Sequence, residues 1–177
     1  MISELYTKRL YLRRLKESDS STLFKIWSDP VVTKHMNISH FMEEKQAKDM
    51  ITFLNTLAYE NKAARFTIIE LASNKIIGSC GYNTLDFAHS KSEIGYELSK
   101  AFWGKGYASE AISGLLKYAF EDLGLNRIEA KVEPQNTNSI KTLQRLNFTL
   151  EGTLRQAEKS KGKFVDLNLY SRLKTDP

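Results

Sequence analysis

The chain has 177 residues, of which 41% are hydrophobic and 27% are charged, and its formal net charge is +5 at pH 7. These values predict one globular domain over residues 1–177, and the apolar runs are too short for a membrane-spanning segment. The lone Cys80 excludes an intramolecular disulfide and three scattered histidines give no metal-ligand spacing, so we expect a reduced, metal-free protein of the cytoplasm.

The N-terminal third of the sequence changes from a strand pattern to a helical one. Residues 5–15 alternate well enough between apolar and polar side chains to predict one strand. A helix should follow, with Ser18 or Asp19 as its N-cap, and should end near Asp29-Pro30. A second helical region is predicted over about residues 39–60, where apolar side chains recur at helical spacing.

The middle of the chain alternates again. Residues 64–71 and 75–82 predict a hairpin, and residues 91–98 predict a third strand. A glycine-containing turn then leads into a helix that starts near Tyr107, and residues 127–133 form the next predicted strand. This strand-helix-strand unit should place the two strands side by side and parallel.

The C-terminal part predicts a helix over residues 137–146 and two strands, residues 148–158 and 164–173, around a turn near Lys161-Gly162. The element order is therefore βααβββαβαββ. We predict an α/β (α+β) fold, with a mixed, mainly antiparallel central sheet of about six to seven strands flanked by helices.

The segment WGKGYASEA, residues 103–111, connects a predicted strand to a predicted helix. The first N–H groups of a helix lack partners and carry the positive end of its dipole, so such a turn suits a phosphate. The Rossmann and Walker motifs do not match, because Ser109 replaces the third glycine and Lys105 is followed by Gly106. The alternative is that the two glycines only shape a tight connection.

Further motifs stand in order around this turn. They are TKRLYLRRL and SDP near the start, IGYEL just before the turn, and NTNS, LNFTLEGTLRQAE and DLNLYSRL toward the end. Together they cover nearly the whole chain and resemble the GNAT superfamily of N-acetyltransferases, specifically the ribosomal-protein N-terminal (RimJ/RimL-like) group. The resemblance implies a GNAT-type sheet and acetyl-CoA as the cosubstrate, with no metal.

The resemblance also implies how acetyl-CoA is held. Backbone amides of residues 104–109 should bind its diphosphate, with Trp103 at the first position of the family's loop pattern and Lys105 near a phosphate. The strand that ends at Leu98-Ser99 should hydrogen-bond the pantetheine arm, because a family sheet opens there and leaves backbone groups unpaired. The residues assigned to the cofactor are Leu98, Ser99, Trp103, Gly104, Lys105, Gly106, Tyr107, Ala108, Ser109, Asn136 and Ser139.

Amine acetylation needs a group that accepts the proton of the amine and a group that protonates the leaving thiolate. By resemblance, Glu158 is the candidate base, acting through water, and Ser139 is the candidate proton donor to sulfur. A backbone amide of the pantetheine-binding strand could polarise the thioester carbonyl.

Each of these roles has alternatives. Glu93 and Glu97 are alternative bases, and Tyr96, Tyr107 and Tyr170 are alternative proton donors. Glu158 could also be an ordinary surface carboxylate, and Ser139 a first-turn helix residue capped by Asn136.

Two departures from the group pattern are Arg14, where proline is common, and Asn147-Phe148, where Gly-Phe is usual. Asparagine tolerates the left-handed conformation that often ends a helix, so the second change is mild. Cys80 lies in a predicted strand with no positive partner evident, so we expect it to be buried structure rather than a nucleophile.

The expected acceptor is a primary amine, most simply the N-terminal α-amine of a ribosomal or other protein. The alternatives are a small amine of the polyamine or aminoglycoside type, or a catalytically silent acyl-CoA-binding module on the same fold. Neither direct nucleic-acid binding nor a membrane partner is expected, since the basic residues are scattered and no recognition motif accompanies them. Monomer and homodimer both remain open.

Overall fold

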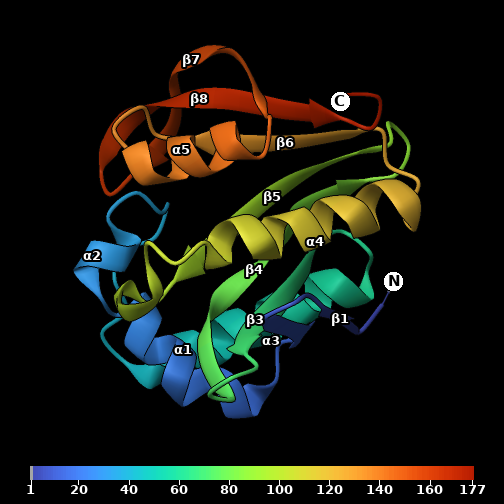
Figure 1. Ribbon diagram of the computed structural model, residues 1–177. Coiled ribbons are helices and arrows are strands. Elements are labelled where there is room, and N and C mark those ends of the chain that lie inside the picture. The colour runs from blue at the N-terminus through green and yellow to red at the C-terminus, as the bar shows by residue number, and fades with distance from the viewer. Residues whose placement is uncertain (1) are drawn as a thin grey trace.

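A computed structural model describes residues 2–177 and shows one eight-stranded sheet between two layers of helices (Figure 1). The strand order is β1-β2-β3-β4-β5-β6-β8-β7; β5 and β6 run parallel, and the other neighbours run antiparallel. The predicted mixed, mainly antiparallel sheet is thus confirmed.

The strands are β1 (Glu4–Tyr6), β2 (Leu10–Arg14), β3 (Ala64–Glu70), β4 (Lys75–Asp86), β5 (Lys91–Leu98), β6 (Arg127–Val132), β7 (Thr149–Ser160) and β8 (Lys163–Leu173). The helices are α1 (Ser20–Trp27), α2 (Pro30–Thr33), α3 (Glu44–Tyr59), α4 (Tyr107–Glu121) and α5 (Thr137–Arg145), with 3-10 turns at Glu17–Asp19 and Lys100–Phe102.

The predicted strand over residues 5–15 is wrong in one respect, because it is two strands. Tyr6 of β1 pairs with Tyr11 of β2, and the Thr7 N–H donates to the Leu10 carbonyl at 2.9 Å to close the turn between them. The three turn residues, Thr7, Lys8 and Arg9, are polar but include neither glycine nor proline, so the sequence does not mark the turn clearly. This extra strand makes the sheet eight-stranded rather than six- to seven-stranded.

The second helical region is also shorter than predicted. The helix α3 begins at Glu44, with Glu43 as its N-cap, rather than near residue 39. The side-chain oxygen of Gln46 accepts hydrogen bonds from the backbone N–H groups of Met42 and Glu43, at 2.6 and 3.0 Å. These bonds fix the start of the helix and leave residues 34–43 as a connection of turns and bends, part of which lines the cleft described below.

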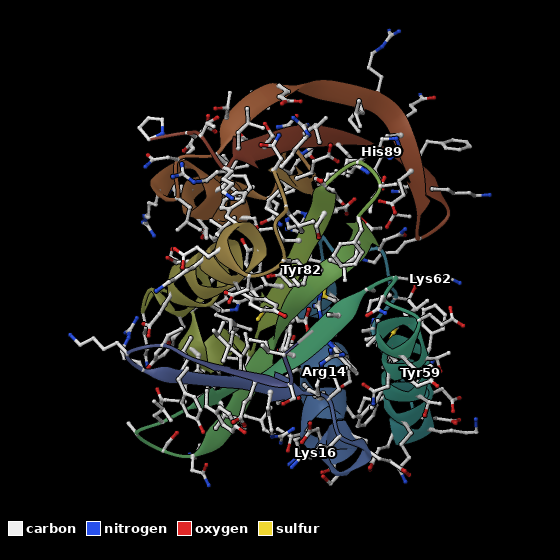
Figure 2. All side chains as sticks on the ribbon, turned by 90° about the vertical axis from the view of Figure 1, so that its right-hand side faces the viewer. Arg14, Lys16, Tyr59, Lys62, Tyr82 and His89 are labelled. Atoms are coloured by element: carbon white, nitrogen blue, oxygen red, sulfur yellow. The ribbon has the colours of Figure 1, made fainter. Side chains whose placement is uncertain are left out.

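Two apolar clusters hold the layers together, one on each face of the sheet. One cluster joins α4 to the sheet, and at its centre the buried Tyr82 donates a 2.6 Å hydrogen bond to the Leu115 carbonyl (Figure 2). The other cluster joins α1 and α3 through residues such as Leu23, Trp27 and Ile51. Cys80 is fully buried in the first cluster, and desolvation raises the pKa of its thiol to about 12, which fits the predicted structural role.

The parallel pair β5 and β6 is short and opens into a gap. The paired residues are Lys91 to Glu93 on β5 and Arg127 to Glu129 on β6, after which the two strands separate. Figure 1 shows them close together on the right and apart on the left, where α2, the start of α4 and the turn of the β7–β8 hairpin gather. This gap positions the candidate site.

No helix within residues 2–177 has the length and apolarity needed to cross a membrane.

Candidate active site

A cleft of about 1190 Å³ occupies the gap between β5 and β6. One wall comes from the turn before α4 and from α5, and we call it the α4–α5 wall. The other comes from residues 31–37, around α2, and from the β7–β8 hairpin, and we call it the α2–hairpin wall. Because a single cleft connects the two walls through an opened sheet, two different molecules can meet at its centre.

The α4–α5 wall presents free backbone donors. Gly104 and Gly106 take left-handed conformations, with φ of 73° and 79°, and Gly106 is the N-cap of α4. Among the described residues, none accepts a hydrogen bond from the backbone N–H groups of residues 104–109. Six consecutive unpaired donors at the positive end of a 15-residue helix make a site for an anion with several oxygens.

Neighbouring residues fix the shape of this turn. The Trp103 indole N–H donates to the Leu98 carbonyl at 2.8 Å, which ties the turn to the end of β5. Arg9, from the turn between β1 and β2, donates to the Lys105 carbonyl at 2.9 Å and forms an ion pair with Glu110 at 2.6 Å. Its guanidinium also lies 4.4 Å from the ring centre of Tyr107. Arg9 therefore braces the turn from outside the cleft.

Glu110 is held ionised by this arrangement. Burial alone would raise the pKa of its carboxyl, but hydrogen bonds from the Thr7 hydroxyl and from Arg9 outweigh burial and lower it. The carboxylate faces Arg9 and Thr7 rather than the free amides, so it does not occupy the anion site.

The helix α5 adds a polar stripe on the same side of the cleft. Asn138, Lys141, Thr142 and Arg145 follow one another at spacings of three, one and three residues and all line the cleft. Within residues 2–177, neither Lys141 nor Arg145 has a carboxylate within ion-pair distance. These two cations make the α4–α5 wall still more suited to phosphate groups.

A hydroxyl pair lies where the two strands open. Tyr96 of β5 donates a 2.9 Å hydrogen bond to Ser139 Oγ in the first turn of α5, and both residues line the cleft. Burial raises the pKa of Tyr96, so its hydroxyl stays protonated near neutrality. Asn136 Oδ1 accepts a hydrogen bond from the Ser139 N–H at 3.3 Å. Asn136 is therefore the N-cap of α5, and Ser139 lies in its first turn, as the sequence analysis gave for the alternative to a catalytic Ser139. Ser139 can thus pass on a proton that Tyr96 replaces.

The α2–hairpin wall carries Glu158. Between Leu154 and Glu158 the pairing of β7 with β8 shifts, and Gln156 has a φ of 47°, so the strand bulges next to the cleft. Glu158 lines the cleft and accepts a hydrogen bond from the Asn37 side chain. Among the carboxylates of the cleft lining, Glu93 and Glu97 pair with Lys131 and Arg65, and Glu133 lies 3.2 Å from His35 Nδ1, whereas Glu158 has no basic side chain within ion-pair distance in the described structure.

The two alternative bases are already neutralised. Glu97 is 5% exposed; it pairs with Arg65 and accepts hydrogen bonds from the Trp27 indole N–H at 2.9 Å and from the Ser79 hydroxyl. Glu93 pairs with Lys131 at 3.0 Å. A carboxylate paired with a cation is a weaker proton acceptor than a free one, so this geometry favours Glu158.

The structure brings most of the predicted site residues to the cleft. The predicted residues that line it are Leu98, Trp103, Gly104, Gly106, Tyr107, Ala108, Ser109, Asn136, Ser139 and Glu158. Lys105 and Ser99 lie outside the lining: the Lys105 ammonium is 5.4 Å from the Phe102 ring centre, and the Ser99 N–H donates to the Ile77 carbonyl of β4. Of the alternative donors, Tyr107 bonds to Glu70, and Tyr170 is buried in the core.

Sequence reasoning missed Arg9, Asn37, Lys141 and Arg145. The cations of α5 could have been found, because their spacing of four residues places both on the helix face opposite Ile140 and Leu143. Arg9 and Asn37 carry no local signal, since each contacts a residue about a hundred positions away.

Comparisons with known proteins agree with this geometry. Residues 9–149 match a family model described as an acetyltransferase (GNAT) domain. The chain is 50% identical over 172 residues to the uncharacterised N-acetyltransferase p20 of Bacillus licheniformis, with 97% of each chain covered. It is 26% identical to the ribosomal-protein-serine acetyltransferase of Escherichia coli over 97% of this chain and 89% of that protein.

A solved structure is also similar over most of the chain. The microcin C7 self-immunity acetyltransferase MccE, in complex with acetyl-CoA and AMP, superposes with a TM-score of 0.85 and 27% sequence identity. The superposition covers 94% of this chain and 93% of that structure.

Proposed function

This chain belongs to the GNAT family of N-acetyltransferases, and from that premise we propose that it transfers an acetyl group from acetyl-CoA to the N-terminal α-amine of a ribosomal or other protein. The observation that carries the proposal is the cleft itself. It joins a wall of unpaired amides to a wall that carries one carboxylate without a cation.

The α4–α5 wall suits the donor substrate. The free amides of residues 104–109 match a diphosphate, and Lys141 and Arg145 supply charge for its further phosphate. The related MccE structure contains acetyl-CoA, which supports the same cosubstrate here. The described residues contain no group of side chains suited to a metal ion, and the proposed chemistry needs none.

The β5 edge suits the pantetheine arm. The N–H of Ser99 points toward β4, so the backbone of Leu98 points the other way, toward the gap, because neighbouring residues of a strand alternate. The Leu98 carbonyl is taken by Trp103, which leaves its N–H as a donor for an amide of the arm or for the thioester carbonyl.

Glu158 acts as the base in this proposal. A protein α-amine enters as an ammonium ion, and the unpaired carboxylate attracts it and then takes its proton, directly or through a water molecule. The Asn37 amide donates to the same carboxylate and orients it. The neutral amine attacks the thioester carbon, a C–N bond forms, and the C–S bond breaks as the thiolate leaves.

Ser139 protonates the leaving group. Its oxygen accepts the Tyr96 hydroxyl proton in a 2.9 Å hydrogen bond, so its own hydroxyl hydrogen is free to point into the cleft. When Ser139 gives this hydrogen to the thiolate, Tyr96 replaces it. The attacking nitrogen loses its second proton to water as the amide forms, and a proton returns from solvent to the Tyr96 oxygen. Glu158 releases its own proton to solvent, so the net result is an N-acetyl amine, free CoA thiol and one proton for each ammonium ion.

A thiol-release assay tests the proposal. The protein is given acetyl-CoA with a panel of N-terminal peptides and, separately, with a panel of polyamines and aminoglycosides. We expect CoA release with peptides. Release with small amines alone would identify a small-molecule acetyltransferase, and CoA binding without release by any amine would identify a silent module.

A further inference from the structure

We propose that the acceptor polypeptide is acidic near its N-terminus, and that its carboxylates bind a basic rim made of Lys34, Lys161 and Lys163. This inference rests on the proposed function and specifies its substrate class. It starts from Lys161 and Lys163 at the turn of the β7–β8 hairpin, together with Lys34 after α2, which the catalytic arrangement leaves unused.

The rim lies at the mouth of the α2–hairpin wall. Lys161, in the turn between β7 and β8, donates from its ammonium to the carbonyl oxygens of Thr33 and Lys34, at 2.6 and 2.9 Å. These bonds join the hairpin turn to the end of α2, and Figure 1 shows the two segments next to each other. Lys34 lines the cleft and its side chain is exposed.

The rim differs in charge balance from the interior of the cleft. Inside, Arg65 pairs with Glu97 and Lys131 pairs with Glu93. At the rim, no carboxylate of residues 2–177 lies within 4.0 Å of the ammonium groups of Lys34, Lys161 or Lys163. Arg65 and Lys131 are thus neutralised by the protein itself, and the unpaired Lys141 and Arg145 belong to the α4–α5 wall, where the proposed function assigns them to phosphate. The rim lysines have no carboxylate of their own and are left for the carboxylates of a ligand.

The strand register places Lys163 on the same face as Glu158. Glu158 pairs with Val165 and Ser160 pairs with Lys163, so all four side chains project to one side of the hairpin. Leu167, on the same face of β8, lines the cleft, which shows that this side faces the site. Lys163 is two rungs from Glu158, or about 7 Å along the strands.

This spacing defines which residues of the acceptor meet the rim. An extended peptide advances about 3.3 Å per residue, so an α-amine at Glu158 places the side chains of its third and fourth residues near the rim. Aspartate or glutamate at those positions would pair with the lysines. A polyamine would instead bring further positive charge to a basic mouth, so the rim also argues against that class of acceptor.

The test compares matched peptides and matched variants. Peptides with acidic residues at positions three and four are compared with the same peptides carrying asparagine or glutamine. For the unmodified protein at about 0.05 M salt we expect a kcat/KM about three- to tenfold higher for the acidic peptides, falling toward equality at about 0.5 M salt. The preference should fall in the Lys34→Gln/Lys163→Gln double variant.

Lys159→Gln is the matched control. Lys159 is on the same hairpin and loses the same charge, but it pairs with Phe164 on the opposite face, and its ammonium is 6.0 Å from that ring. It should keep the acidic preference. Equal kcat/KM for acidic and neutral peptides, or an equal loss in Lys159→Gln, would overturn the rim while leaving the proposed function intact. Failure to acetylate any peptide would overturn both.

Discussion

The two walls of the cleft are built in different ways. The α4–α5 wall is made largely of backbone groups and of side chains from one short helix, all fixed by the turn before α4 and by the start of α5. The α2–hairpin wall depends on contacts between distant parts of the chain, such as Asn37 with Glu158 and Lys161 with Thr33. The family-model match ends at residue 149, before most of that hairpin.

The two walls therefore suit two kinds of substrate. Backbone amides bind a common phosphate group whatever the surrounding side chains are, so the first wall suits a constant substrate. Side chains that project from two separate segments can change without altering the fold, so the second wall suits a variable one. If the two walls act independently, a substitution on one wall should leave the substrate of the other wall unaffected.

The largest effect is expected on the α2–hairpin wall, from Glu158→Gln. Losing the general base should lower kcat about 10²- to 10³-fold near neutral pH, while CoA affinity measured by calorimetry stays nearly unchanged. Glu93→Gln is the control, because that carboxylate is already paired with Lys131 and should be largely dispensable. Full activity in Glu158→Gln would remove it as the base, and a large loss of CoA affinity would show that the walls are coupled.

On the α4–α5 wall, Gly106→Val should weaken CoA binding about tenfold or more. Valine disfavours the left-handed conformation by about 1–2 kcal/mol, and its Cβ would lie 3.4 Å from a guanidinium nitrogen of Arg9, so the turn that presents the free amides would have to change its backbone conformation. Gly162→Val is a matched control, since Gly162 has nearly the same φ, 78°, in a turn away from this wall. It should reduce stability without changing CoA affinity. Unchanged affinity in Gly106→Val would reject the anion site.

The hydroxyl pair sits between the walls and should affect chemistry alone. Ser139→Ala and Tyr96→Phe should each slow thiol release about tenfold, because the leaving thiolate loses its proton supply. The double variant should be little worse than either single variant, since both act on one proton. Additive losses in the double variant would contradict the relay, and full activity in Ser139→Ala would leave Ser139 as a structural residue of α5.

Arg9→Gln should act on the donor substrate only, and more weakly. It removes the brace on the Lys105 carbonyl and leaves Glu110 without its cation, so we expect the KM for acetyl-CoA to rise about three- to tenfold with the KM for the amine unchanged. Lys8→Gln removes a neighbouring charge that makes none of these contacts. Equal changes in both KM values would show that Arg9 supports the fold generally.

The smallest effect is expected in acid stability. Hydrogen bonds from Arg127, and then from Ser171, lower the pKa of Glu151 to about 2 in the folded state, below its ordinary value of about 4.3. A lowered folded pKa means that the carboxylate stabilises the protein above the ordinary value, and that this stabilisation is lost as the pH falls toward 2. Glu151→Gln should therefore show a flatter decline in unfolding midpoint between about pH 5 and 2. An unchanged pH dependence would contradict the assignment.

Sequence patterns predicted the fold well where they were strong and local. The strand at Lys91–Leu98, the start of α4 at Tyr107 and the parallel β5–β6 unit all match. The errors lie at the turn between β1 and β2 and before α3, where no glycine or proline marks the change of direction. In both places a side-chain or backbone contact, rather than local propensity, ends the element.

The candidate site also contains residues that local sequence patterns predict and residues whose roles depend on contacts between distant parts of the chain. The amides of residues 104–109 follow from two glycines before an amphipathic helix, so the sequence alone predicts them. The pairing of Glu97 with Arg65, which distinguishes it from Glu158, joins residues 32 positions apart, and Asn37 lies 121 positions from its partner. Such contacts depend on the sheet order, which no local pattern encodes.

A titration with CoA, followed by the backbone amide signals of ¹⁵N-labelled protein, tests whether the α4–α5 wall binds the cosubstrate. The amides of residues 104–109 should shift most, and those of the β7–β8 hairpin turn, around Lys161, should shift little. Large shifts at the hairpin turn with none at residues 104–109 would show that the α4–α5 wall does not bind the cosubstrate.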